Sequence, residues 1–188
     1  EIGILNSLRD KVFDRCSICF SPNTNKYYSK QGFPYFNPYH SGQYTIFLYY
    51  FSNTIFHEAK DHTRLADKVY YLNKVMNSID LFYEVELPEI FMLDQPGGTV
   101  LGRAKFGNFF KFTQNCCVGN NNDVFPVIGK NVTMTANSMI FGKSNIGDNV
   151  IVGVGACIKD EYIPEKSFVF GESPNLIIKR RKPNDKVS

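Results

Sequence analysis

The chain has 188 residues, a formal net charge of +3, and 43% hydrophobic residues. This length suffices for one domain with a sizeable core, or for a small domain joined to a repeat array. The mild charge does not favour nucleic acid as a partner, because Lys and Arg are scattered until residues 179–182. The apolar run at 46–56 is too short to span a bilayer, so we expect no membrane span.

The five cysteines indicate buried thiols in a reducing compartment, because their number is odd and two of them are adjacent. Cys16 and Cys19 form a lone pair, which we interpret as structural, with a metal or redox role as the alternative. No signal peptide is visible. We therefore expect a cytoplasmic protein that has no metal site.

Two helices are predicted in the first half of the chain. Residues 2–19 are compatible with a short helix, and residues 21–37 form a loop rich in Pro, Asn and Tyr. Ser41 is a plausible N-cap for a helix that runs to about Ala59. A second helix is predicted from about Thr63 to residues 77–78, because apolar residues recur there at helical spacing.

From residue 100 to residue 158 the apolar residues follow a period of six. The lead positions are Val100, Phe106, Phe112, Val118, Ile128, Met134, Ile140, Ile146, Val152 and Ile158. Core-sized residues follow most of them four positions later: Ala104, Phe110, Cys116, Val132, Ser138, Ser144, Val150 and Ala156. Neither a helix nor a flat strand has this period, whereas a coil of short strands joined by tight turns does. The pattern therefore predicts a hexapeptide-repeat β-helix.

The repeat is interrupted once, between Val118 and Ile128, so extra residues within 120–126 must loop out of the coil. Insertions in repeat proteins lie on one face, which is often the binding face. We divide the chain into a mostly helical domain at 1–88, a β-helix at 89–170 and a tail at 171–188. The expected fold class is mainly β with an α-helical N-terminal part.

Several segments resemble the serine O-acetyltransferase family of hexapeptide acyltransferases. They are Ser41-Gly42-Gln43-Tyr44, Asp80-Leu81-Phe82-Tyr83-Glu84-Val85, Leu93-Asp94-Gln95-Pro96-Gly97-Gly98-Thr99-Val100-Leu101-Gly102, and the ending Val169-Phe170-Gly171-Glu172-Ser173-Pro174. The resemblance implies a left-handed parallel β-helix, a trimer or a dimer of trimers, and acetyl-CoA as the acyl donor. It also implies an acceptor that carries a hydroxyl group.

The family's catalytic base is a His that directly follows an Asp, and the matching pair in this chain is Asp94-Gln95. A carboxamide has no basic lone pair and cannot take the proton of the acceptor hydroxyl. The family's Arg-His-Pro in the insertion matches Val124-Phe125-Pro126, so both imidazoles are replaced. Asp94 keeps its implied role, which is to fix a polar end of the acceptor such as an amine.

Four interpretations of Gln95 stay open. The protein binds without catalysing, or the residue is an engineered change, or the base lies elsewhere, or the alignment is displaced. Among the three histidines, His40 is best placed to supply a base, because it directly precedes the Ser41 helix. The alternative for His40 is a surface loop residue. The candidate catalytic residues are therefore Asp94, Gln95 and His40.

In the resembling family, CoA lies in a groove between neighbouring subunits, where small residues allow the thioester to approach closely. The matching candidates are Gly119, Asn120, Ala136, Asn137, Gly153, Val154, Gly155 and Ala156. Lys159, Lys179, Arg180 and Arg181 are candidates for the CoA phosphates. The alternatives are residues that only form tight turns, and a solvated basic tail.

The leading hypothesis is an acetyl-CoA-dependent O-acetyltransferase whose acceptor is a serine-like amino acid or a sugar. A second hypothesis keeps the coil and CoA but acylates a nucleotide-sugar for a surface polysaccharide. The third is a catalytically impaired homologue that acts as a binding or scaffold subunit, which the Asp94-Gln95 pair favours. Fold analogy alone does not separate the three.

Overall fold

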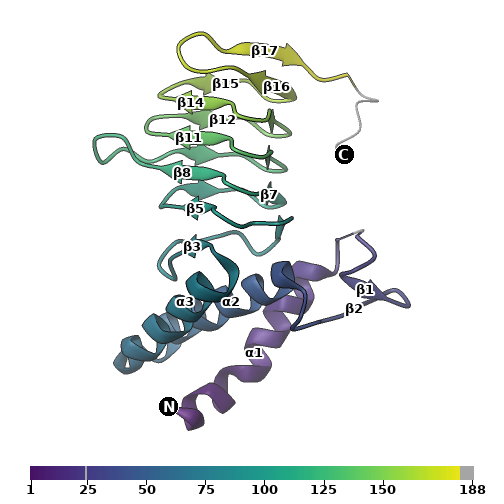
Figure 1. Cartoon of the computed structure of the whole chain (residues 1–188), viewed down its shortest axis with the longest axis vertical. Helices are drawn as coiled ribbons and strands as arrows, with labels where there is room; N and C mark the ends of the chain where they lie inside the picture. Colours follow the sequence, from purple (N-terminus) through teal and green to yellow (C-terminus); the bar gives the residue numbers. More distant parts are fainter. Residues whose placement is uncertain (24, 183–188) are drawn as a thin grey trace.

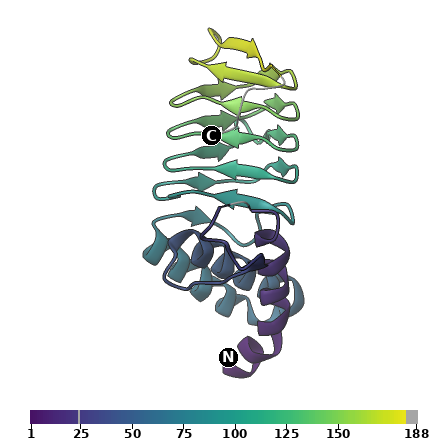
Figure 2. The same cartoon turned by 90° about the vertical axis from the view of Figure 1, so that its right-hand side faces the viewer.

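The computed structural model describes residues 1–23 and 25–182. It consists of an α-helical N-terminal part and a stack of β-coils that rises from it (Figures 1 and 2). Among the described residues, no helix is long and apolar enough to cross a membrane.

The helical part contains α1 (Ile2–Phe20), α2 (Ser41–Glu58), the short 3-10 helix η1 (Lys60–His62) and α3 (Thr63–Asn77). Both predicted helices are confirmed, with one correction at the start of α2. His40, not Ser41, is the N-cap, and its side chain accepts a hydrogen bond from the backbone N–H of Gln43. An N-cap residue has an extended backbone, and in this helix that residue is His40, since Ser41 is already helical. The capping group is therefore the imidazole of His40 and not the hydroxyl of Ser41.

Helix α2 is buried on almost every side, because it packs against both α1 and α3 and lies beneath the coil (Figure 1). Polar groups on α2 therefore need partners inside the protein. Asn53 donates to the backbone oxygen of Tyr83, and the Tyr49 hydroxyl donates to that of Val85. Between α1 and α2, the segment predicted as a loop contains a small antiparallel ribbon, β1 (Ser29–Lys30) and β2 (Phe33–Pro34).

The coil has three parallel faces, which the chain visits in turn. Face 1 is made of β3 (Asp80–Leu81), β5 (Val100–Leu101), β8 (Cys117–Gly119), β11 (Met139–Phe141) and β14 (Cys157–Lys159). Face 2 is made of β6 (Lys105–Phe106), β9 (Val127–Ile128), β12 (Asn145–Ile146) and β15 (Tyr162–Ile163). Face 3 is made of β4 (Phe91–Leu93), β7 (Phe110–Phe112), β10 (Thr133–Met134), β13 (Ile151–Val152) and β16 (Ser167–Phe170), and β17 (Ile177–Arg180) pairs antiparallel with β16.

The predicted six-residue rhythm is confirmed, because the leads from Phe112 to Ile158 stack inside the coil and are buried. The first lead was placed wrongly. Val100 is 43% exposed, whereas Leu101 is 2% exposed and pairs with Val118 of the next coil. The turn that follows β5 is one residue shorter than a regular hexad, and this shifts the inward side chain from Val100 to Leu101.

The corners of the coil are turned by residues in the left-handed backbone region. Between faces 3 and 1 these residues are Gly98, Asn115, Asn137 and Gly155, and between faces 2 and 3 they are Phe109, Asn131, Asn149 and Lys166. Asparagine tolerates this conformation better than most residues. Its amide also links successive coils, as the Asn115 Nδ2 to Asn137 Oδ1 bond of 3.0 Å shows. The corners therefore have both the backbone shape and the cross-links that a tight coil needs.

The ladders of face 1 begin at β3, ahead of the expected boundary at residue 88, and β17 extends face 3 beyond residue 170. The division into folding domains at these two positions stays a prediction.

Candidate active site

The Asp94-Gln95 pair lies on the corner between faces 3 and 1, in the coil next to the helices. Strand β4 ends at Leu93, and the backbone N–H of Asp94 continues the ladder by donating to the oxygen of Phe112. Gln95 adopts a left-handed backbone with φ of 49°. Both side chains are exposed. The pair therefore presents a carboxylate and a carboxamide to solvent at a fixed corner.

The turn at 97–99, which follows the pair, is fixed by a left-handed glycine and by the hydrogen bonds of one buried side chain. Gly98 has φ of 76°, and a Cβ there would overlap the Asn115 side chain. Thr99 is fully buried; its Oγ1 donates to the oxygen of Thr113 at 2.7 Å and accepts from the N–H of Cys116 at 3.1 Å. The Thr99 hydroxyl thus ties the Asp94 turn to the next coil.

We expect Thr99→Val to destabilise the protein by about 1–3 kcal/mol, because it leaves a buried carbonyl and a buried N–H without partners. The change keeps the side-chain shape, so it removes the hydrogen bonds without opening a cavity. Urea unfolding compared with Thr113→Val, whose half-buried hydroxyl makes only a 3.5 Å contact, measures the difference. Equal loss in the two variants would contradict this role for Thr99.

His40 is held close to the strand that ends at Asp94. A Cβ placed on Gly42 would lie 2.8 Å from the Tyr28 hydroxyl, 3.0 Å from Leu93 Cδ1 and 3.2 Å from His40 Cε1, so these three side chains converge there. The His40 Nδ1 accepts the capping hydrogen bond from Gln43 at 3.3 Å. In the neutral ring this contact places the proton on Nε2. Proton abstraction by His40 would need the capping bond to break, and its catalytic role stays a prediction.

A cavity of about 180 Å³ opens beside Asp94 on face 3. It is lined by Asn23, Asn25, Tyr28, Met92, Leu93, Asp94 and Lys111. Burial raises the pKa of the Tyr28 hydroxyl, and electrostatic interactions with the nearby Cys19 and Asp94 raise it further. Tyr28 therefore stays protonated and donates to the Leu93 oxygen at 3.4 Å, so it is not a base.

Sequence analysis missed most residues of this cavity. The segment that carries Asn23, Asn25 and Tyr28 shows no periodicity, and only the fold brings it against face 3. Lys111 had a detectable signal: it stands between the buried Phe110 and Phe112, and alternation in a strand places it on the outer face.

Six of the predicted CoA residues lie on the same corner as Asp94, in the coils above it. Four backbone N–H groups form a column along this corner, and each donates a hydrogen bond to a carbonyl oxygen of the next coil. They belong to Asp94, Thr113, Thr135 and Gly153. Ala136, Asn137 and the turn 153–156 belong to these coils, and Gly155 N–H donates to the Ala136 oxygen at 2.9 Å. Val154 is 71% exposed, and the space around Gly155 is open. Gly153 instead lies under the ring of Phe170.

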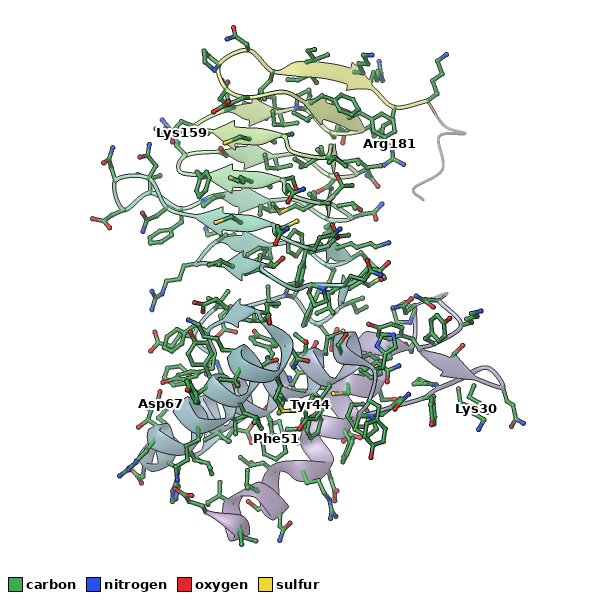
Figure 3. The ribbon with its side chains drawn as sticks, viewed as in Figure 1. Lys30, Tyr44, Phe51, Asp67, Lys159 and Arg181 are labelled. Carbon is green, nitrogen blue, oxygen red and sulfur yellow. The ribbon has the colours of Figure 1, made fainter. Side chains whose placement is uncertain are left out.

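The other predicted CoA residues lie elsewhere in the chain. Gly119, Asn120 and Lys159 lie at the opposite edge of face 1, on the side from which the loop after β8 projects (Figures 1 and 3). Lys179 and Arg180 are exposed on β17. One chain alone therefore does not bring all of these residues together.

The insertion forms a small hairpin, with an Asn121–Val124 bridge and left-handed backbone at Asn122 and Asp123. Asn121 Nδ2 donates to Asp160 Oδ2 at 2.7 Å, which fixes the base of the hairpin to the coil of β14, two coils from β8. Val124 and Phe125 are exposed. The polar residues Asn122 and Asp123 form the tip of the hairpin, and the exposed apolar pair Val124-Phe125 follows it, where the resembling family carries an imidazole.

A larger cavity of about 770 Å³ lies at the C-terminal end, lined by Asn149, Lys166, Arg180, Arg181 and Lys182. Arg181 lies 5.5 Å from the Phe168 ring centre and donates to the Asn149 oxygen at 3.0 Å (Figure 3). Four cationic side chains around one cavity favour anionic groups. This cavity borders the corner between faces 2 and 3, away from the Asp94 corner.

All five cysteines are free thiols, and Cys16, Cys19 and Cys116 are buried. Burial raises the pKa of the Cys16 thiol to about 12, so it is not a nucleophile. Within residues 1–23 and 25–182, no group of three or more His, Cys, Asp or Glu side chains has the arrangement of a metal site.

No family model matches the chain, and no curated protein matches it in sequence. Solved structures do match it. Serine acetyltransferase from Vibrio cholerae O1 biovar El Tor N16961 has a TM-score of 0.73 at 21% identity, over 94% of this chain and 69% of that one. The enzyme from Brucella abortus strain S19 has a TM-score of 0.72 at 15% identity, over 96% and 73%. A serine acetyltransferase in complex with CoA has a TM-score of 0.73 at 17% identity, over 95% and 73%. The chain thus has the left-handed β-helix fold of the serine acetyltransferases, including its helical N-terminal part.

Proposed function

We propose that this protein is an acetyl-CoA-dependent O-acetyltransferase that acts on a small acceptor with a hydroxyl group, a serine-like amino acid or a sugar. One observation carries the proposal. Asp94 and Gln95 occupy the same corner of the coil as Ala136, Asn137 and the 153–156 turn. A hydroxyl held at Asp94 and a thioester lying along this corner would meet on one edge of the molecule.

The corner suits a flexible thioester arm. The left-handed turns leave Val154 exposed and the space around Gly155 open, so an arm can lie against the backbone there. Lys159 and the basic residues of β17 offer charges for the CoA phosphates. A solved structure of the same fold is a complex with CoA, which supports the choice of donor.

The reaction is acyl transfer. The acceptor oxygen attacks the thioester carbonyl carbon, the carbon–sulfur bond breaks, and the hydroxyl proton ends on the CoA thiolate. A base that removes this proton normally accelerates the step by about 10²–10⁴-fold. Gln95 has no basic nitrogen. We therefore infer slow catalysis, in which binding and orientation supply most of the rate enhancement.

A second candidate function is a catalytically impaired subunit that binds CoA or acceptor without efficient turnover. The specific observation in its favour is that neither the Asp94-Gln95 pair nor the insertion at 120–126 carries an imidazole. Acceptor-dependent release of CoA by the wild-type protein would exclude it.

We propose a homo-oligomer, a trimer or a dimer of trimers, without nucleic acid and located in the cytoplasm. Face 1 supports the assembly, because its outer surface exposes Val100 and Met139 beside the half-buried Cys117 and Cys157. A neighbouring copy would also bring the edge with Gly119, Asn120 and Lys159 to the Asp94 corner of the next chain. The buried free thiols agree with a reducing compartment. Ultracentrifugation that finds a monomer would contradict this proposal.

Calorimetry with acetyl-CoA tests the donor site. We expect a site in the micromolar range, and Val154→Trp should weaken it at least tenfold because the ring would cover the open corner. Val75→Trp, at another exposed valine, on α3, is the matched control and should bind normally. Absence of binding by the wild-type protein would remove the transferase proposal.

A further inference from the structure

Beside the small ribbon of β1 and β2 lies a cavity, which we call the ribbon cavity. The ribbon projects from the helices (Figures 1 and 3). The segment 21–40, which contains it, has two lysines, six aromatic residues and no Asp or Glu. The cavity has a volume of about 280 Å³ and is lined by Lys26, Tyr27, Ser29, Lys30, Tyr35, Asn37 and His40. It is therefore basic and aromatic, and none of these lining residues belongs to the coil.

The two lysines of the ribbon cavity have no carboxylate partner in the described part of the chain. The Lys26 ammonium lies 5.1 Å from the ring centre of Tyr27, and the Lys30 ammonium lies 5.5 Å from the ring centre of Tyr35. The ion pairs among the described residues all involve other side chains. Two positive charges beside two aromatic rings favour an anionic ligand in this cavity.

The rings of Tyr27 and Tyr35 are 56% and 44% exposed. Tyr28, which lies between them in the fold and packs into the core, is only 2% exposed, so packing does not account for the other two rings. The His40 ring lies 5.9 Å from that of Tyr27 at an angle of 38°. Exposed aromatic faces stack with flat rings of a ligand. The cavity thus suits a ligand that has both a flat ring and a negative charge.

One buried side chain fixes two walls of the ribbon cavity. Gln43 on α2 is fully buried. Its Nε2 donates to the backbone oxygen of Tyr27 at 2.6 Å, and its Oε1 accepts from the backbone N–H of Asn37 at 2.5 Å. The backbone N–H of Tyr35 donates to the oxygen of Tyr28 at 3.0 Å, which continues the ribbon. A cavity whose walls are already ordered loses less entropy when a ligand binds.

We propose that the ribbon cavity binds a nucleoside phosphate, with its base against Tyr27 or Tyr35 and its phosphates at Lys26 and Lys30. This site goes beyond the proposed function and does not depend on acetyl transfer. A phosphate alone would leave the rings without a partner, and an uncharged ring would leave both ammonium groups without one. The volume lies near the lower limit of small-molecule pockets, about 300–1,000 Å³, so a single nucleotide is favoured over a nucleic-acid chain.

The test uses the full-length protein and calorimetry with ADP, CDP, GDP and UDP. The corresponding nucleosides lack the phosphates, and inorganic phosphate lacks the base. We expect at least one diphosphate to bind tenfold or more tightly than its nucleoside and than inorganic phosphate, because only the diphosphate uses both the rings and the ammonium groups.

Two variants separate the two contributions. Tyr35→Ala should weaken the diphosphate at least fivefold through lost stacking. Tyr71→Ala, at an exposed tyrosine on α3, is its control and should bind normally. The double change of Lys26 and Lys30 to Met should weaken the diphosphate at least tenfold and leave the nucleoside unaffected, even if Tyr35→Ala fails to fold. The same double change at the exposed Lys105 and Lys143 of the coil is the control and should alter nothing.

CoA contains a nucleoside phosphate of its own, so its site must be distinguished from the ribbon cavity. Val154→Trp should weaken acetyl-CoA and leave the diphosphate unaffected. If Val154→Trp removes diphosphate binding, the nucleotide lies on the coil and the ribbon cavity is not its site. If acetyl-CoA does not bind but a diphosphate binds and depends on Lys26, Lys30 and Tyr35, the ribbon cavity stands and the transferase proposal falls.

Three further results would overturn the proposal. They are binding of none of the four diphosphates, binding of a nucleoside or of inorganic phosphate as tight as that of every diphosphate, and diphosphate binding that survives both ribbon variants. A single-stranded oligonucleotide that binds more tightly than every diphosphate would assign the ribbon cavity to a nucleic acid instead.

Discussion

Gln95→His is expected to raise the rate of acetyl transfer at least tenfold, and by up to about 10²–10⁴-fold if proton removal limits the wild-type reaction. The physical reason is the lone pair of a neutral imidazole, which takes the acceptor proton at physiological pH where a carboxamide does not. The left-handed backbone at Gln95 accepts histidine, which is enriched in this region. Initial rates of acceptor-dependent CoA release measure the effect.

Gln95→Asn is the control, because asparagine fits the same backbone and adds no basic nitrogen. Its rate should stay at the wild-type level or below. If Gln95→His also leaves the rate unchanged, the base lies elsewhere, and His40 becomes the next residue to test. His40→Asn preserves an N-cap side chain for α2 while removing the imidazole, so a loss of rate with this variant would identify His40 as the base.

The coil could be predicted from the sequence because the same requirement, an inward-facing apolar side chain on each face, recurs in every coil. Each coil places a lead side chain inward on every face, so Val118, Ile140 and Ile158 occur at regular spacing and stack in the structure. The error at Val100 has the same origin. A period counts residues, and it does not detect a turn that is one residue shorter.

The candidate site was only partly predictable. Asp94 and the 153–156 turn lie on one corner because the same period that builds the coil also aligns its corners. Lys111 and Asn25 come together only when residues 21–37 pack on face 3, and that packing leaves no periodic signal in the sequence. The split of the CoA residues between two edges of face 1 was also missed, because linear spacing does not show on which edge of the face a residue lies.

Gly129→Ala is expected to lower the free energy of unfolding by about 2–3 kcal/mol, which corresponds to a fall in Tm of about 4–12 °C for a chain of this length. Gly107, Gly129 and Gly147 each follow the lead residue of face 2 and stack coil upon coil. A Cβ on Gly129 would lie 2.8 Å from the backbone carbon of Gly147 and 2.9 Å from the backbone nitrogen of Asp148. Thermal unfolding followed by circular dichroism measures the change.

The loss should be large because the obstacle is backbone. Gly129 N–H donates to the Ile146 oxygen at 2.8 Å, and Gly107 N–H donates to the Ile128 oxygen at 2.9 Å, so separating the coils to admit a methyl group would stretch the ladder that holds them. Gly97→Ala is the matched control, because a Cβ there meets nothing within 4 Å and the backbone is not left-handed. Its Tm should change by no more than a few degrees. Equal Tm values for the two variants would contradict this argument, because the coils of face 2 could then move apart without loss of stability. The close spacing of the coils would in that case depend on the packing of the interior side chains.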